Sequence, residues 1–298
     1  MIKRILLPLE HGDDATSAVA LARRMAQRRK VELLLLRVEE WPISGSFGFG
    51  WAPSWRAGRL QALKSDLEGP EGVPATILSP EALPASSILK QARLRAASLI
   101  VVPYRHERAL LRVLGGHPAD RILRDSPLPV IAVPATESPR LSGLSRVLYT
   151  YENGPQAVPG LHRAIEFAQM FDATLFLQRL RSAAPPSAAS PFEPRDDAAQ
   201  GGQDAKSLEG RLLWILKRRE VPTQLLPAAG EPLRDVVGAV VQNAIDLALV
   251  ARTHDSERAR LSLARHILEE AQIPVLLTPE ESPLSPVTGS GSRVRVGI

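Results

Sequence analysis

The sequence predicts an α/β protein of two tandem doubly wound domains, each built on a five-stranded parallel sheet. Three observations predict this fold: short continuous apolar runs, helical stretches that alternate with them, and a repeat of the whole pattern 142 residues later. Continuous apolar runs are typical of parallel strands that helices cover on both faces. The length of 298 residues also favours two domains over one.

The predicted elements follow the same order in both halves. In the first half we expect strands at 4–9, 31–38, 75–78 and 99–102, helices at 17–28 and 88–97, and a closing helix and strand within 120–134. In the second half the corresponding strands are 146–151, 173–180, 223–226 and 247–250, the helices 161–170 and 233–244, and the closing pair lies within 265–279. The spacing is kept inside the repeat, since Leu33 and Leu175 are again 142 residues apart.

Segments between the repeats set the expected domain organisation. Residues 1–137 form the first domain, 138–145 a linker, 146–281 the second domain and 282–298 a flexible tail rich in Ser, Gly and Pro. The segment Trp41 to Gly58 holds five of the thirteen aromatic residues and is predicted to be a loop. It either packs over its own domain or a subunit interface, or it serves as a lid or docking surface for a protein partner.

Composition excludes several classes of protein. The chain has no cysteine, which removes disulfides, thiolate zinc sites and cysteine nucleophiles. Early carboxylates and the absence of a long apolar run argue against a signal peptide or membrane span, so we expect a cytoplasmic protein without membrane contact. The net charge of +5 is mild, and nucleic-acid binding through the basic loops is a minor alternative that predicts a steep salt dependence. No G-x-S-x-G, Walker or H-E-x-x-H motif is present, so enzyme activity is the minority interpretation.

The first half carries a family resemblance. The segment GGHPADRILRDSPLPVIAVP, together with the opening ILLPLE and the IVV strand, resembles a domain of the universal stress protein family. The resemblance implies a flavodoxin-like or adenine-nucleotide-hydrolase-like fold and a stress-responsive binding or regulatory role without turnover. It also implies that the two domains pair within one chain, as single-domain relatives do in dimers, through the edge strands Val130–Val133 and Val275–Thr278.

Nucleotide-binding members of that family carry an Asp after the first strand, which meets the base, and G-x2-G-x9-G-[ST] after the fourth strand, which wraps ribose and phosphates. Glycines allow backbone N–H groups to approach phosphates, and the following helix N-terminus favours their charge. In the first half this four-residue pattern falls on Pro103, His106, Gly116 and His117. In the second half it falls on Ala251, His254, Leu261 and Ser262, and the loop is three residues shorter. Glu10 and Glu152 stand in place of the Asp, and Gly116 is the one motif glycine kept.

The residues at these motif positions and beside them define a candidate ligand site in each half. In domain 1 the candidates are Glu10, Arg105, His106, Gly116 and His117, and in domain 2 they are Glu152, His254 and Ser262. Basic side chains crowd both loops, where guanidinium groups either replace the glycine cradle for an anion or form an ordinary solvated surface. We assign no catalytic residue, and a metal site at His11, His106 and His117 has no ligand spacing to support it.

The sequence thus favours a stress-response binding or regulatory protein without family-style ATP binding. No cofactor is expected under this interpretation. The alternative is an ATP- or AMP-binding sensor that uses domain 1, with slow hydrolysis as an added option, and Gly116 is the residue that supports it.

Overall fold

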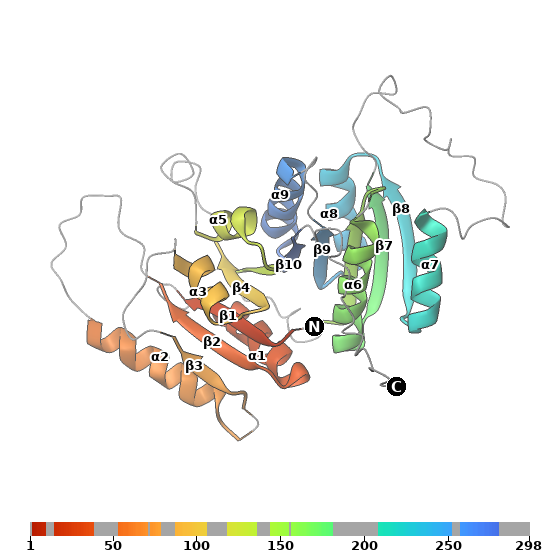
Figure 1. Ribbon diagram of the computed structural model, residues 1–298. Helices are drawn as coiled ribbons and strands as arrows, with labels where there is room; N and C mark the ends of the chain where they lie inside the picture. Colours follow the sequence, from red (N-terminus) through yellow and green to blue (C-terminus); the bar gives the residue numbers. More distant parts are fainter. Residues whose placement is uncertain are drawn as a thin grey trace, which may run out of the picture.

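The computed structural model defines the architecture of both halves (Figure 1). The residues that it describes are 2–9, 15–38, 53–70, 72–78, 87–105, 118–135, 144–154, 156–180, 208–251 and 257–279.

Strands and helices alternate along both halves. The first half contains β1 (Arg4–Leu9), α1 (Thr16–Arg29), β2 (Glu32–Arg37), α2 (Pro53–Leu67), β3 (Ala75–Ile77), α3 (Ile88–Leu94), β4 (Leu99–Tyr104), α5 (Pro118–Asp125) and β5 (Val130–Pro134). The second half contains β6 (Arg146–Tyr151), α6 (Ala157–Phe171), β7 (Thr174–Leu180), α7 (Leu208–Arg219), β8 (Thr223–Ala229), α8 (Pro232–Gln242), β9 (Leu247–Ala251), α9 (Glu257–His266) with the π-helical turn η7 (Ile267–Ala271), and β10 (Val275–Thr278). The α/β class and the parallel strands predicted from the apolar runs are confirmed.

The structure bears on two boundaries expected from the sequence. The segment Trp41 to Gly58 was expected to be a loop, but α2 begins within it at Pro53, and residues 41–52 lie outside the described residues. Proline suits the first position of a helix because its φ is already helical and its missing N–H is not needed there. Near the second boundary, Leu144 is buried in the core, and the Ser145 backbone N–H donates to Asp246. An apolar side chain and a satisfied backbone donor attach these two residues to the second half.

One sheet runs through both halves. In the described residues it has ten strands in the order β3-β2-β1-β4-β5-β10-β9-β6-β7-β8. Each half is parallel within itself, and the order within it corresponds to the first five strands of the 3-2-1-4-5-6 dinucleotide-binding arrangement. The halves meet where β5 and β10 run antiparallel, with Leu276 opposite Ile131. This pairing converts two five-stranded sheets into one.

Alternate residues of the strands feed two hydrophobic cores, one on each face of the sheet. In β1, Ile5 and Leu7 point to one core and Leu6 to the other. The first core is covered by α1, α2, α6 and α7, and the second by α3, α5, α8 and α9 (Figure 1). Both cores contain residues from both halves, so the protein is a three-layered unit that extends across the junction.

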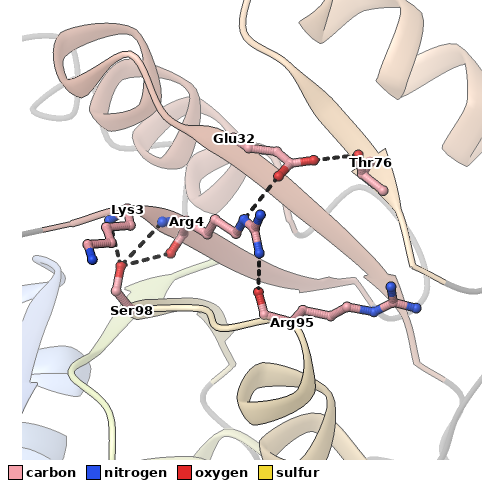
Figure 2. Close-up of polar contacts among 6 residues, drawn as sticks. All are labelled: Lys3, Arg4, Glu32, Thr76, Arg95 and Ser98. Carbon is pink, nitrogen blue, oxygen red and sulfur yellow. Dashed lines mark hydrogen bonds and ion pairs between the residues drawn. The ribbon is translucent and has the colours of Figure 1, made fainter.

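The amino ends of the first-half strands are closed by a polar network (Figure 2). Arg4 forms an ion pair with Glu32 at 3.3 Å between Nε and Oε2, and its Nη1 donates to the carbonyl of Arg95 at 2.8 Å. Glu32 in turn accepts the Thr76 hydroxyl at 2.6 Å, and the Ser98 hydroxyl oxygen accepts the Arg4 amide at 3.3 Å. These contacts join β1, β2, β3 and the start of β4, so the polar side chains at this edge stabilise the sheet.

The second half closes the same edge in a related way. Asp246 accepts the backbone N–H groups of Ser145 and Arg146 at 2.8 and 2.9 Å, and Arg146 donates to the carbonyl of Asn243 at 3.0 Å. Asp246 stands where the first half has Ser98, and Asn243 where it has Arg95. Since the amino edges hold structural contacts in both halves, a ligand site is expected at the carboxyl edges.

The two halves differ in the sizes of two contacting residues, one on the first strand and one on the first helix. Tyr149 of β6 is fully buried, and its hydroxyl donates to the Ala157 carbonyl at 2.7 Å. A methyl group added at Gly160 of α6 would meet the Tyr149 hydroxyl and lie 2.9 Å from two of its ring carbons. The corresponding residues of the first half, 142 positions earlier, are Leu7 and Ala18. The larger strand residue of the second half therefore requires the smaller helix residue.

We predict that Gly160→Ala lowers the free energy of unfolding by about 1–3 kcal/mol, because the added methyl overpacks against the Tyr149 ring. Gly238→Ala in α8 is the matched control, since a methyl there meets no atom within 4 Å. That substitution should stabilise the helix by about 0.5–1 kcal/mol. Urea unfolding of the two variants measures both values, and equal shifts would contradict the packing argument.

The three tyrosines of the chain, Tyr104, Tyr149 and Tyr151, are all buried. Burial raises the pKa of each above the ordinary value of 10.0, and for Tyr151 it reaches about 12. The folded state therefore holds these phenol protons more tightly than the unfolded state does. The associated stability is complete below pH 10 and is lost as the pH rises through the folded pKa values.

We predict that tyrosinate absorbance of the native chain develops only above pH 11 or together with unfolding, whereas the urea-unfolded chain titrates at about pH 10. The free energy of unfolding should fall between pH 10 and pH 12. A native titration that overlays the unfolded one would show that the rings are exposed to solvent.

Candidate functional site

The carboxyl ends of the central strands form the candidate site in each half. Strand order reverses between β1 and β4 in the first half and between β6 and β9 in the second, and α/β sheets bind ligands at such switch points. Because β5 and β10 are antiparallel, the two candidate sites lie at opposite edges of the continuous sheet.

In the second half the site holds a buried ion pair. Glu152 follows β6, and its Oε2 lies 2.8 Å from Nη2 of Arg260 on α9. The Arg260 side chain is 2% exposed and that of Glu152 is 30% exposed. The guanidinium therefore lies within the protein, while its carboxylate partner keeps some contact with solvent. The pair joins the end of the first strand of this half to the first turns of the helix after the fourth strand.

Helical periodicity places Arg260 inside. It lies three, four and seven residues before Leu263, Ala264 and Ile267, all of which are buried against the second core. Residues with this spacing share one face of a helix, so the arginine is the first member of an otherwise apolar stripe. A cation in that position needs a carboxylate, and Glu152 at the end of β6 supplies one.

The predicted site residues separate into three groups. Glu152 lies in the site, whereas Ser262 is exposed on α9 and does not share the buried face with Arg260. Arg105 directly follows β4 at the carboxyl edge of the first half and is half-buried. The remaining candidates lie outside the described residues: Glu10, His106, Gly116, His117 and His254.

Sequence reasoning missed the structural role of Arg260. The residue lies in the basic loop after the fourth strand of the second half, for which the sequence left open an anion cradle or a solvated surface. The signal was nevertheless present, since the i, i+3, i+4, i+7 pattern from Arg260 through Ile267 is visible in the sequence.

A second polar cluster connects the two halves near the carboxyl edge of the first half. The Tyr104 hydroxyl at the end of β4 donates to Glu269 Oε1 of the π-helical turn at 3.0 Å. Arg265 Nε of α9 lies 2.8 Å from Asp120 Oδ1 of α5. Burial raises the pKa of Tyr104, and the negative charges of Asp120 and Glu269 add to this effect. The second half thus contributes Glu269 to the edge where the first-half site is expected.

Two further searches of the described residues bear on the type of site. Among them there is no group of three or more His, Asp or Glu side chains that could hold a metal ion. None of their helices combines the length and the apolar character needed to cross a bilayer.

Comparison with known proteins agrees with this architecture. The family model described as the universal stress protein family matches residues 1–134. A universal stress protein of Thermus aquaticus is 30% identical over 137 residues, which cover 45% of this chain and 99% of that protein. The crystal structure of a universal stress protein from Archaeoglobus fulgidus superposes with a TM-score of 0.70 at 16% identity, covering 94% of this chain and 97% of that one.

A putative universal stress protein from Pseudomonas aeruginosa has the same fold over 93% of both chains, with a TM-score of 0.61 and 16% identity. Both crystal structures extend over nearly the full length of this chain, so their similarity in fold includes the second half. Together with the Thermus relative, which this chain spans almost completely, these findings show that the chain belongs to the universal stress protein family.

Proposed function

We propose that this protein is a stress-response binding or regulatory protein in which neither half binds ATP in the manner of nucleotide-binding family members. The observation that carries the proposal is the buried ion pair between Glu152 and Arg260. Its two partners stand at the two ends of the place that a nucleotide would occupy in this family.

Glu152 stands where those members have the Asp that meets the base. Arg260 directly precedes Leu261 and Ser262, the positions that align with the last glycine and the hydroxyl residue of the phosphate loop. The carboxylate is therefore already engaged, and the ion pair links the strand end to the helix start. An incoming nucleotide would have to displace an internal side chain before it could make either contact.

Displacement is unfavourable on energetic grounds. Separating a buried ion pair leaves an uncompensated charge and typically costs about 3–5 kcal/mol. Such a cost reduces affinity by roughly two to four orders of magnitude. The absence of motif glycines from this half removes the backbone contacts that could offset it.

The first half differs in keeping one motif residue, Gly116. Pro103, at the first motif position, lies in β4 opposite Val133 of β5 and has no backbone N–H to offer a phosphate. An ATP or AMP sensor based on the first half remains the alternative function, and the binding experiment below separates it from the proposal.

We predict that Arg260→Ala lowers the free energy of unfolding by about 2–4 kcal/mol, because it removes both the charge partner of Glu152 and a packed side-chain stem. Arg23→Ala serves as the control, since Arg23 pairs with the largely exposed Asp66 at 3.2 Å. The loss there should be below about 1 kcal/mol. Urea unfolding measures both losses. Equally small values would mean that the contact of Arg260 with Glu152 does not stabilise the fold.

We predict that the Gly116→Arg chain, in which the last motif glycine is lost, binds neither ATP nor AMP in isothermal titration calorimetry. Gly115→Arg is the matched control, because this substitution adds the same charge one residue outside the motif. One equivalent of nucleotide bound to Gly116→Arg would show that the second half binds it and would contradict the proposal.

The unmodified chain is tested alongside by denaturing extraction and mass spectrometry. An empty chain that ATP and AMP do not stabilise supports the nucleotide-independent role. Nucleotide that is retained by the unmodified and Gly115→Arg chains but lost from Gly116→Arg establishes the sensor alternative in the first half.

A further inference from the structure

We propose that charges of opposite sign at repeat-equivalent positions make the two halves pair with each other and disfavour pairing of either half with its own copy in a second chain. The inference concerns the junction between the halves and does not depend on the ligand question.

The junction has an approximate twofold axis that the register identifies. Ile131 of β5 and Leu276 of β10 lie opposite each other, and each is the second residue of its strand. Val130 pairs with Leu277 and Ala132 with Val275, which is the reciprocal pattern of an isologous contact. The axis therefore passes between Ile131 and Leu276.

Residues that touch their own repeat equivalent lie close to this axis. Asp120 and Arg265 are such a pair, because each precedes the first residue of its edge strand by ten positions. The two side chains meet at 2.8 Å between Oδ1 and Nε, with α5 and α9 adjacent across the junction (Figure 1). Their side chains are 15% and 31% exposed, so solvent screens the contact only in part.

Pairing of two identical halves would replace this attraction by a repulsion. If two first halves met through the same surface, Asp120 would face a second Asp120, and two second halves would bring Arg265 against Arg265. Like charges held together in a partly buried contact disfavour a wrong partner, whereas the opposite charges of the natural pair favour it. Duplication within one chain permits this arrangement, because a homodimer must carry the same residue on both sides of its axis.

The opposite face of the sheet has a second ion pair across the junction, and it disfavours one of the two wrong pairings. At the C-terminal ends of α1 and α6, Arg28 Nη1 lies 3.0 Å from Asp172 Oδ2. The first-half equivalent of Asp172 is Lys30, and both residues adopt the same left-handed conformation, with φ of 54° and 52°. Two first halves would therefore place Arg28 against Lys30. This contact is more exposed than the first and adds less, but its sign is the same.

The test changes the charge at one of the two positions in the full chain and then measures which chains associate in a mixture. Asp120→Arg gives a chain with arginine on both sides of the axis, and Arg265→Asp gives a chain with aspartate on both sides. Each variant alone has like charges at its junction. A mixture can restore two opposite-charge contacts if the halves exchange between chains, so the two variants should form a mixed dimer.

The two variants are given different masses, unfolded together in urea, refolded and examined by native mass spectrometry. We expect the mixed dimer of the two variants to be about tenfold more abundant than the mixed dimer formed by two mass-labelled unmodified chains. The doubly exchanged chain Asp120→Arg/Arg265→Asp should behave like the unmodified one. A matched control uses Arg23→Asp and Asp66→Arg, an ion pair contained within the first half, and should yield no excess of mixed species.

A mixed species no more abundant than in the reference overturns the proposal, as does an equal excess in the control. If the single variants fail to fold alone, the doubly exchanged chain decides. The proposal requires it to unfold at the same urea concentration as the unmodified chain, and a chain no more stable than the single variants would refute it.

Discussion

The antiparallel contact between β5 and β10 joins the two halves along their edge strands. It satisfies the backbone groups of two edge strands that would otherwise remain open to aggregation. It also places α1 beside α6 on one face of the sheet and α5 beside α9 on the other. Both hydrophobic cores consequently extend across the junction, and the halves share their interiors as well as an edge.

The same contact sets the positions of the candidate sites. An antiparallel junction turns the carboxyl ends of the two halves toward opposite edges of the sheet, so neither site can include the central strands of the other half. The halves still influence each other through side chains near the junction, since Glu269 of the second half accepts the hydroxyl of Tyr104 beside the first-half site. Coupling between the halves can therefore be sought in this contact rather than in a shared ligand.

The two halves have diverged in ways that keep the architecture and alter the interior. The second half exchanges a leucine and an alanine for Tyr149 and Gly160 without a change in the layers. At the carboxyl edge of its sheet it has an internal ion pair between Arg260 and Glu152. Opposite charges at equivalent positions, such as Asp120 and Arg265, are a third kind of divergence, which a symmetric homodimer cannot have.

The repeat, the parallel α/β class and most strand positions can be predicted from the sequence alone, because buried strands need continuous apolar runs and the chain has them. The strands at 4–9 and 146–151 agree with the prediction residue for residue. The three-dimensional arrangement was needed to show that Glu152 is the partner of Arg260 and that Asp120 meets Arg265. These features depend on which surfaces face each other after folding, and a charged residue has the same letter in the sequence whether it meets water or a buried partner.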